Sequence, residues 1–352
     1  MADLSKFDPN SIGLSTNNIF GLPFEEADAR LVLVPVPWEV TVSYRPGTAH
    51  GPEQVFNSSL QVDLYDADVK DAWKQGFYMQ PVEKSLLSKS DYLRHCAELI
   101  ISHLSEGGVI EENEQLTRKL NGINQAGEEL RQWVYERTKK LMDDGKLVGL
   151  LGGDHSTPLG FIEAVADQHG EIGILQIDAH ADLRKAYEGF TYSHASIMYN
   201  VMELLPKVTK LVQVGIRDYC DEEMDYINGS NGRVVTFFDK NIKERMYEGE
   251  NWKQICDSIV EQLPSKVYIS FDIDGLDPKL CPNTGTPVHG GFEVDQINYL
   301  FRKVVESGRT IVAFDLNEVS CGTHGGLDTM DANVGARVLY KLCNFLIASN
   351  PQ

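Results

Sequence analysis

The chain has 352 residues, of which 42% are hydrophobic and 24% are charged, so it holds enough apolar material for a sizeable core. It contains 52 Asp and Glu against 32 Lys and Arg, and the formal net charge of −20 argues against nucleic acid as a partner. A small cationic molecule suits such a chain better. Because no Pro-rich, Gly-rich or Ser-rich linker divides the sequence, we expect one domain over residues 1–352.

The sequence also favours a cytoplasmic location. Residues 1–18 lack the basic start and the apolar run of a secretory signal, and no apolar stretch approaches the roughly 20 residues that a membrane-spanning helix needs. The six cysteines are scattered and form no CxxC pair, which is typical of reduced thiols in a long intracellular chain. We therefore expect no disulfide bond and no membrane partner.

Short apolar runs rich in β-branched residues recur along the chain, and each predicts a buried strand. In chain order they are 31–36, 147–151, 172–177, 211–216, 234–238, 267–271 and 311–316. Apolar residues at helical spacing predict helices at 157–167, 193–205, 252–263, 294–307 and 332–348. Strands that alternate with helices favour an α/β fold, in which helices cover both faces of a mainly parallel central sheet.

One region interrupts this alternation. Between about residues 88 and 144 the pattern predicts two helices, at 90–105 and 126–142, joined by a charged segment at 106–122. We interpret this region as a helical elaboration within the domain, because it shows no low-complexity stretch, repeat or heptad array.

The residues that carry chemistry follow three of the predicted strands. Residues 150–156 read LLGGDHS, residues 176–182 read QIDAHAD, and residues 270–278 read SFDIDGLDP. In a parallel α/β sheet, ligands bind outside the carboxyl ends of the strands, so three segments that are remote in sequence can converge there. Side chains alternate between the two faces of an extended chain, so acids and histidines two positions apart can point the same way.

A cluster built from these segments would need positive counter-charge. Six side chains could converge: His155, Asp178, His180, Asp182, Asp272 and Asp274. Four buried carboxylates without counter-ions would repel one another and take up protons, and two divalent cations would balance their charge. Oxygen ligands combined with imidazole favour Mn²⁺, with Ni²⁺, Fe²⁺ and Zn²⁺ as alternatives.

Each segment also has a simpler explanation. An Asp after a strand often caps the next helix, and a His can satisfy a buried hydrogen bond. Asp154 in the first segment fits such a supporting role. The explanation is adequate for one segment, but the coincidence of three segments at three strand ends favours a metal site.

In these segments the sequence resembles the ureohydrolase superfamily of arginases, agmatinases and formimidoylglutamases. The family motifs GGDHS, DAHxD and SFDxDxxDP correspond to residues 152–156, 178–182 and 270–278, in the family's order. The similarity runs from about Leu31 to the C-terminus. The resemblance implies an arginase-like three-layer αβα fold, a centre of two Mn²⁺ ions and a homo-oligomer, commonly a trimer or hexamer.

Position by position, the resemblance implies the role of each ligand. His155 and Asp182 would bind one metal, His180 and Asp274 the other, and Asp178 and Asp272 both. Two metals lower the pKa of a shared water molecule and stabilise charge in a tetrahedral intermediate, so the bridging Asp178 would also belong to the catalytic set.

Three further residues match substrate and proton-transfer positions of the family. Glu318 corresponds to the glutamate that binds the guanidinium group, which it would orient by charge-assisted hydrogen bonds. His194 corresponds to the histidine that passes a proton to the departing amine. Thr286 corresponds to a threonine beside the substrate. The expected products are urea and an amine.

The substrate is predicted from residues 183–196, which resemble the agmatinase loop more than the arginase loop. Agmatine, a dication, suits an acidic protein, and Glu188 is a candidate partner for its distal amine. Arg184 and Lys185 could instead recognise a carboxylate. Such a carboxylate is present in 4-guanidinobutyrate and formiminoglutamate, which are alternative substrates. Guanidine and arginine are further alternatives, because the helical elaboration could reshape the pocket.

Two other classes of protein compete with a ureohydrolase. A deacetylase on the related fold would use a single Zn²⁺, but His155 and Asp274 supply the additional ligands for a second metal. A noncatalytic metal-binding protein would not need His194 and Glu318. Both features favour the ureohydrolase interpretation.

Overall fold

A computed structural model describes residues 4–322 and 330–351. Within these residues, eight strands form one sheet in which all neighbouring strands run parallel, in the order β2-β1-β3-β8-β7-β4-β5-β6. The strands are β1 (Leu31–Val36), β2 (Phe77–Met79), β3 (Leu147–Gly152), β4 (Ile172–Ile177), β5 (Val208–Ile216), β6 (Val234–Phe238), β7 (Lys266–Asp272) and β8 (Thr310–Asn317).

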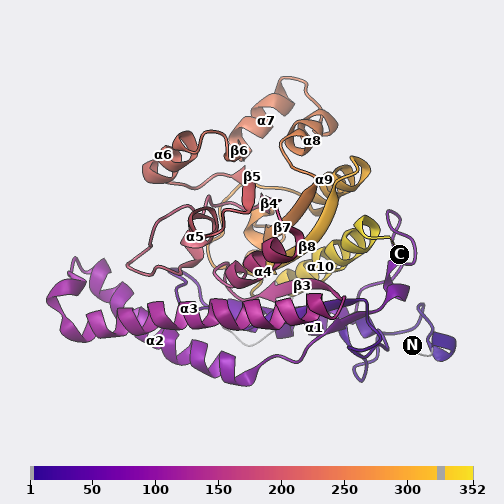
Figure 1. Ribbon diagram of the computed structural model, residues 1–352, viewed down its shortest axis with the longest axis horizontal. Coiled ribbons are helices and arrows are strands. Elements are labelled where there is room, and N and C mark those ends of the chain that lie inside the picture. The colour runs from indigo at the N-terminus through magenta and orange to yellow at the C-terminus, as the bar shows by residue number, and fades with distance from the viewer. Residues whose placement is uncertain (1–3, 323–329, 352) are drawn as a thin grey trace.

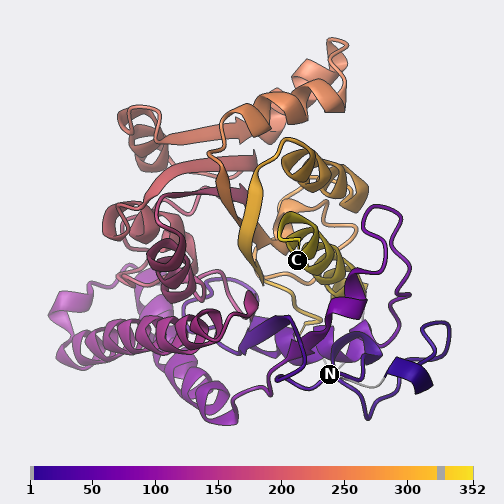
Figure 2. The same cartoon turned by 45° about the vertical axis from the view of Figure 1, so that its right-hand side comes forward.

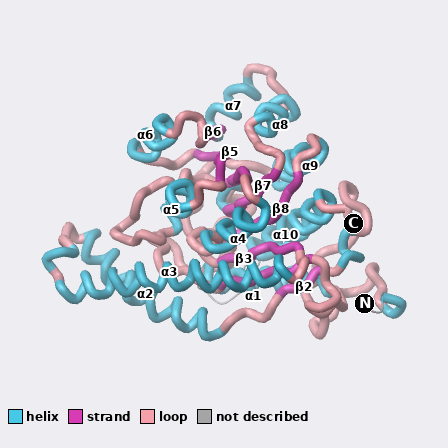
Figure 3. Tube along the Cα trace, in the orientation of Figure 1, coloured by secondary structure: helices cyan, strands magenta, loops and turns pink. Residues whose placement is uncertain are grey.

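Helices cover both faces of this sheet, as Figures 1 and 2 show. In the described part of the chain the α-helices are α1 (Gly51–Ser59), α2 (Lys84–Ser105), α3 (Glu114–Asp143), α4 (Leu159–His169), α5 (Ile197–Leu204), α6 (Asp221–Gly229), α7 (Asp239–Tyr247), α8 (Trp252–Glu261), α9 (Val294–Glu306) and α10 (Met330–Ser349). Figure 3 shows the strands running through the middle of the molecule. The expected three-layer αβα arrangement is confirmed.

Two apolar cores explain the three layers. In β1, Leu31 and Leu33 belong to the core that packs against α8, α9 and α10, whereas Val32 and Val34 belong to the core that packs against α2, α3, α4 and α5. Successive side chains of a strand point to opposite faces, so a strand covered on both sides must be apolar throughout. This is why the predicted strands read as continuous apolar runs.

The seven predicted strands are present, with small shifts at their ends, but the expected list was incomplete. Strand β2 has only three residues and lies at the edge of the sheet, so its sequence carries no long apolar run. The short helices α1, α6 and α7 were also not predicted. Every helix in residues 4–322 and 330–351 is too short or too polar to cross a membrane.

The helical elaboration differs from its prediction at both helix starts. Helix α2 begins at Lys84, before the predicted start at residue 90, and α3 begins at Glu114, inside the segment predicted as a connection. The side chain of Asn113 caps α3, because its Oδ1 accepts hydrogen bonds from the backbone N of Gln115 (3.1 Å) and Leu116 (3.2 Å). The charged residues after Asn113 therefore lie on the solvent-facing side of the long helix α3.

Candidate active site

The three sequence segments with Asp and His lie side by side because of the strand order. They follow β3, β7 and β4, and β8, which leads to Glu318, lies between β3 and β7. These four strands are consecutive in the middle of the sheet, and their carboxyl ends share one edge. The fold thus brings the segments to one place, as their positions after parallel strands predict.

The first cluster is centred on His155. Its Nδ1 lies 3.0 Å from Asp178 Oδ2, 3.1 Å from Asp182 Oδ2 and 3.3 Å from Asp272 Oδ2, and all four residues are buried. The second cluster is centred on His180, whose Nδ1 lies 3.0 Å from Asp274 Oδ2 and 3.7 Å from Asp178 Oδ1. Asp178 faces both imidazoles. The structure therefore brings together all six side chains that the sequence singles out.

The donor atoms of the clusters fit cations. His155 Nδ1 and Asp274 Oδ2 are both buried, and neither makes a hydrogen bond. A buried polar atom left without a partner is costly unless a ligand satisfies it. Within each of the groups His155, Asp178, Asp182 and Asp178, His180, Asp274, the ligand atoms lie within 4.8 Å of one another. This is the spacing that a shared metal ion requires.

The charges of the two clusters also favour bound cations. Burial raises the pKa of Asp182 to about 7, and the charge of Asp178 adds to this effect. Burial followed by the charges of Asp274 and Asp178 holds the pKa of Asp272 well above its ordinary value. Burial lowers the pKa of His155, but the carboxylates around it outweigh burial and raise it well above 6.5. The clusters thus attract positive charge, which protons or metal ions can supply.

A chain of hydrogen bonds behind His155 fixes the orientation of its ring. His155 Nε2 lies 2.9 Å from Ser270 Oγ, and Ser270 Oγ donates to Asp315 Oδ1 at 3.0 Å. Asn317 Nδ2 donates to the same carboxylate oxygen at 2.5 Å. Because the Ser270 hydroxyl proton goes to Asp315, Ser270 accepts the Nε2 proton of His155. The lone pair of Nδ1 is then left facing the carboxylates, as a metal-binding histidine requires.

Two of the predicted site residues have a left-handed backbone. The φ angles are +54° at Asp182 and +63° at Glu318. Such angles are uncommon outside glycine, and they persist only where surrounding bonds enforce them. The carbonyl of Asp182 accepts hydrogen bonds from the N of Met198 and Tyr199, both at 3.1 Å, and Glu318 N donates to Gly153 O at 2.8 Å. The strain is thus held in place by α5 and by the segment after β3.

Glu318 has one occupied and one unoccupied carboxylate oxygen. Its Oε1 accepts a hydrogen bond from His155 N at 2.9 Å, whereas the buried Oε2 has no hydrogen-bond partner. Burial raises the pKa of Glu318 well above its ordinary value, and the charge of Asp272 adds to this. A Cβ atom at Gly285 would approach Oε2 to 3.0 Å, so the glycine leaves space beside this oxygen.

A cavity of about 130 Å³ lies next to the second cluster. The residues that line it are Ser43, His180, Asp182, Arg184, Tyr187, His194, Ala195, Asp218, Tyr219, Glu223 and Thr286. Thus the predicted site residues His194 and Thr286 border the same cavity as two residues of the Asp and His clusters. Asp218, Tyr219 and Glu223 were not among the predicted site residues.

His194 is 9% exposed, and two hydroxyl groups surround its Nδ1. Thr41 Oγ1 lies 3.5 Å and Ser193 Oγ 3.4 Å from this nitrogen. Burial, and then the positive charges of His180 and His155, lowers the pKa of His194 to about 3. His194 is therefore neutral near pH 7.

Glu188 does not line the cavity. It lies on the loop that precedes His194 and has a φ angle of +54°, and its buried Oε2 has no hydrogen-bond partner. Burial raises the pKa of Glu188, while the charge of Arg94 in α2 opposes this rise. The structure therefore places Glu188 beside the helical elaboration.

The elaboration supports the loop that borders the cavity. In α3, Asn124 Nδ2 donates to Gly189 O at 3.2 Å, and Asn124 Oδ1 accepts from Thr191 N at 2.9 Å. Tyr192 packs where α3 has a glycine: a Cβ at Gly127 would come within 2.7 Å of the Tyr192 side chain. The loop that precedes His194 is thus fastened to α3.

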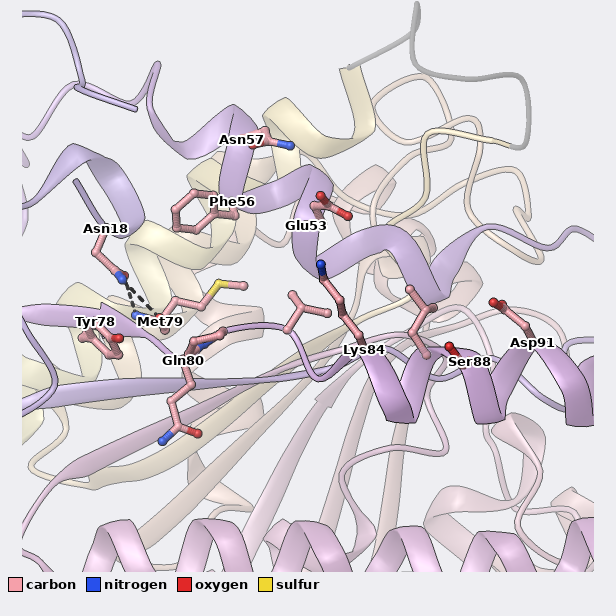
Figure 4. A pocket seen from close by; sticks show the side chains of 13 residues that line it. Asn18, Glu53, Phe56, Asn57, Tyr78, Met79, Gln80, Lys84, Ser88 and Asp91 are labelled. Atoms are coloured by element: carbon pink, nitrogen blue, oxygen red, sulfur yellow. Dashed lines mark hydrogen bonds between the residues drawn. The ribbon is translucent and has the colours of Figure 1, made fainter. Parts of the chain in front are cut away.

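A larger cavity of about 630 Å³ lies elsewhere, between α1, the end of β2 and the start of α2. Figure 4 shows Phe56 and Met79 in its apolar part and Glu53 and Lys84 at its rim. The side chain of Asn18 covers the edge of β2 there, because Met79 N donates to Asn18 Oδ1 at 2.7 Å. No His or Cys is among its described lining residues, so this cavity lacks the donor set of the Asp and His clusters.

The parallel αβα fold carries two candidate metal-binding groups of Asp and His side chains at the carboxyl ends of its central strands. The chain belongs to the arginase family, whose model matches residues 29–344. It is a ureohydrolase that acts on guanidino compounds.

Two relatives are similar to most of the chain. An N(1)-aminopropylagmatine ureohydrolase of Thermus thermophilus is 33% identical over 298 residues, covering 85% of this chain and 84% of the relative. An enzyme described by the same name in Synechocystis sp. is 30% identical over 298 residues, covering 84% and 82%. The crystal structure of the agmatine ureohydrolase of Thermoplasma volcanium shares the fold, with a TM-score of 0.67, 19% identity and 92% of each chain covered.

Proposed function

We propose that the enzyme hydrolyses the guanidino group of agmatine to give putrescine and urea, and that it does so with two Mn²⁺ ions. The observation that carries this proposal is the acidic cavity beside the two Asp and His clusters. A dicationic substrate can place its guanidinium group near the clusters and its amine in the cavity. The class of the enzyme and the family relationship support the cleavage of a C–N bond in a guanidino group.

Six side chains would hold the metals. We assign His155 and Asp182 to one ion, His180 and Asp274 to the other, and Asp178 and Asp272 to both. The short distances within each cluster and the unpartnered buried atoms support this assignment. When bound, the ions would act as Lewis acids and lower the pKa of water in the site. Carboxylate and imidazole ligands favour Mn²⁺, and Ni²⁺, Fe²⁺ and Zn²⁺ are the alternatives.

Glu318 would bind and orient the guanidinium group. Its Oε2 is buried and unpartnered, and the backbone N of His155 holds the other oxygen. A guanidinium group can donate to that free oxygen by a charge-assisted hydrogen bond, and this fixes the position of its central carbon. Thr286, which lines the cavity, would limit the positions that the substrate chain can take.

His194 would move a proton to the departing amine. Because the Thr41 and Ser193 hydroxyls face Nδ1, the Nε2 atom is the one available for proton transfer. A neutral imidazole can accept a proton at Nε2 and then deliver it to the amine nitrogen as the C–N bond breaks.

The cavity favours a substrate with a positive distal end. Arg184 Nε lies 3.9 Å from Glu223 Oε2 and the guanidinium of Arg184 packs 4.9 Å from the ring of Tyr187, so Arg184 offsets the charge of Glu223. Asp218 remains as a second acid in the lining. We therefore propose Asp218 as the partner of the distal amine, with Glu188, whose Oε2 is unpartnered, as the alternative.

N(1)-aminopropylagmatine is the second candidate substrate. Three relatives with at least 30% identity carry that substrate in their names. It shares the guanidino group and the positive tail of agmatine but has a longer tail. The same site chemistry would serve either molecule, and the length of the cavity decides between them.

A urea-release panel tests the proposed substrate. We expect the Mn²⁺-loaded enzyme to have its highest kcat/KM with agmatine, against N(1)-aminopropylagmatine, 4-guanidinobutyrate, arginine and guanidine, with formiminoglutamate followed through formamide. The same panel with Ni²⁺ enzyme checks the metal. Rapid turnover of another guanidine without urea release from agmatine would reject agmatine as the substrate.

A pair of variants separates the two candidate amine partners. We expect Asp218→Asn to raise the KM for agmatine by about tenfold or more, the equivalent of one charged hydrogen bond, and to leave the KM for guanidine, which has no tail, nearly unchanged. Glu188→Gln is the matched comparison. A larger rise in KM for Glu188→Gln than for Asp218→Asn would move amine recognition to Glu188.

We also propose that the enzyme is cytoplasmic and forms a homo-oligomer, a trimer or hexamer. The scattered cysteines without a CxxC pair support the first statement, and the family resemblance supports the second. Light scattering on the eluate of a size-exclusion column gives the mass of the assembly directly, and a monomeric mass of 39.4 kDa would contradict the oligomer.

A further inference from the structure

Arg217 connects three parts of the candidate active site. It directly follows β5, which lies beside β4 in the sheet. The backbone N of Arg217 donates to Ala179 O at 2.8 Å, and that alanine lies between Asp178 and His180 in the sequence. The backbone of Arg217 is therefore already joined to the segment that carries two of the proposed metal ligands.

Among the described residues, the side chain of Arg217 donates only to backbone carbonyls. Nη2 donates to the carbonyls of Asp274 (2.6 Å), Leu276 (3.2 Å) and Val288 (2.8 Å). Nε donates to Val288 O (3.3 Å) and His289 O (3.1 Å), and Nη1 donates to Gly215 O (3.3 Å). One planar guanidinium group thus joins the segment after β7 to the loop that follows Thr286.

No carboxylate group forms an ion pair with Arg217 among the residues that the structure describes. The arrangement therefore differs from a salt bridge between side chains. An arginine has five N–H donors in a rigid fork and no acceptor, so it can satisfy several carbonyls at once. The guanidinium group therefore holds these carbonyls, and the residues to which they belong, at fixed separations.

The loop that Arg217 holds is tightly packed. Gly290 has φ +100°, and a Cβ atom there would lie 2.7 Å from Asp239 Oδ2 and 3.2 Å from Arg217 Cδ. On the other side, Phe292 N donates to Gly275 O at 3.2 Å and Asp277 N donates to Phe292 O at 2.9 Å. The loop is thus confined between Arg217 and Asp239 on one side and the segment after Asp274 on the other.

We propose that Arg217 is a positioning residue. It holds the metal ligand Asp274 and the loop carrying Thr286 in a fixed position relative to the ligands that follow β4. The proposal rests on the proposed function, because it treats Asp274 as a metal ligand. Arg217 contacts the backbone of Asp274, so its loss would loosen the ligand without removing a ligand atom. Residues that orient metal ligands typically contribute a factor of about 10 to 100 in metal affinity or activity.

The chain offers a matched control in Arg233. It too donates to backbone carbonyls, those of Met202 (2.6 Å), Leu205 (3.2 Å) and Val208 (2.7 Å). These carbonyls lie in α5, at its C-terminal end and at the first residue of β5, whereas Arg217 follows the end of β5. Loss of Arg233 would therefore remove a similar set of hydrogen bonds, and so lower the stability of the fold, at the opposite edge of the sheet.

The test measures Mn²⁺ binding by equilibrium dialysis, together with kcat, KM and melting temperature, for the full chain. We expect Arg217→Met to need about 10 to 100 times more free Mn²⁺ for half-saturation and to raise the KM for the substrate. Arg217→Lys should lie between this variant and the unchanged enzyme, because lysine offers fewer donors on a flexible chain. Arg233→Met should lower the melting temperature and leave Mn²⁺ affinity unchanged.

Two results would overturn the proposal. One is an Mn²⁺ affinity of Arg217→Met, or of Arg217→Lys should the first variant not fold, within about twofold of the unchanged enzyme. The other is an equal loss of Mn²⁺ affinity in Arg233→Met. Failure of the unchanged enzyme to bind Mn²⁺ with two ions per subunit would instead count against the proposed function, which separates the two ideas.

Discussion

Replacing Asp274 by alanine should lower kcat/KM by more than about a thousandfold and leave at most one firmly bound metal ion per subunit. The reason is that Asp274 Oδ2 is buried, has no hydrogen-bond partner and lies 3.0 Å from His180 Nδ1. Removal of this oxygen leaves His180 without the acid that completes its cluster. A metal centre lowers the pKa of water by about eight units, so loss of half of the centre removes most of the rate. Elemental analysis and urea release measure both effects.

Asp257→Ala is the matched control for this variant. Asp257 lies on α8 at the surface and, in the part of the chain that the structure describes, pairs only with Lys253, at 2.6 Å. Exposed pairs of this kind contribute little to stability, so metal content and urea release should remain unchanged. Two metal ions per subunit and ordinary turnover in Asp274→Ala would contradict the assignment of this residue as a ligand.

Replacing His194 by alanine should lower kcat by about 100- to 10,000-fold while metal content stays at the level of the unchanged enzyme. His194 borders the cavity, and the contacts of its Nδ1 are with the hydroxyls of Thr41 and Ser193. It is therefore placed to transfer a proton and is not part of either cluster. Urea release measures kcat, and elemental analysis of the same preparation measures the metal content.

A second measurement separates proton transfer from packing. If His194 only filled space, added imidazole would not restore the rate of His194→Ala, whereas a proton-transfer role predicts partial rescue that rises with imidazole concentration. His95→Ala is the control, since its side chain is 74% exposed on α2. Loss of metal ions together with activity in His194→Ala would show that the proton-transfer assignment is wrong.

The sequence predicted the centre of the sheet well because the relevant signals are local. Strands covered on both faces must be apolar along their whole length, and such apolar runs can be recognised directly in the sequence. The Asp and His residues follow such runs immediately, so their place at the carboxyl edge required no knowledge of the strand order. The structure brings the six side chains together, while their role as metal ligands stays a prediction.

The parts that were missed depend on contacts between distant segments. Strand β2 has three residues and exists as a strand because β1 pairs with it. Helix α3 begins at Glu114 because the side chain of Asn113 caps it, and a count of apolar positions in a charged stretch does not reveal this cap. Among the acids near the site, only the tertiary structure distinguishes Asp218, which borders the cavity, from Glu188, which lies against the helical elaboration.

The order of the strands has a consequence for how the protein matures. The Asp and His residues follow β3, β4 and β7. Strand β8, which inserts between β3 and β7, is the last of the described strands to be synthesised. Until β8 is in place, the His155 segment and the Asp272 segment are not neighbours. Metal capture should therefore be a late event that marks a completed sheet, and chelators should lower the melting temperature of the finished protein.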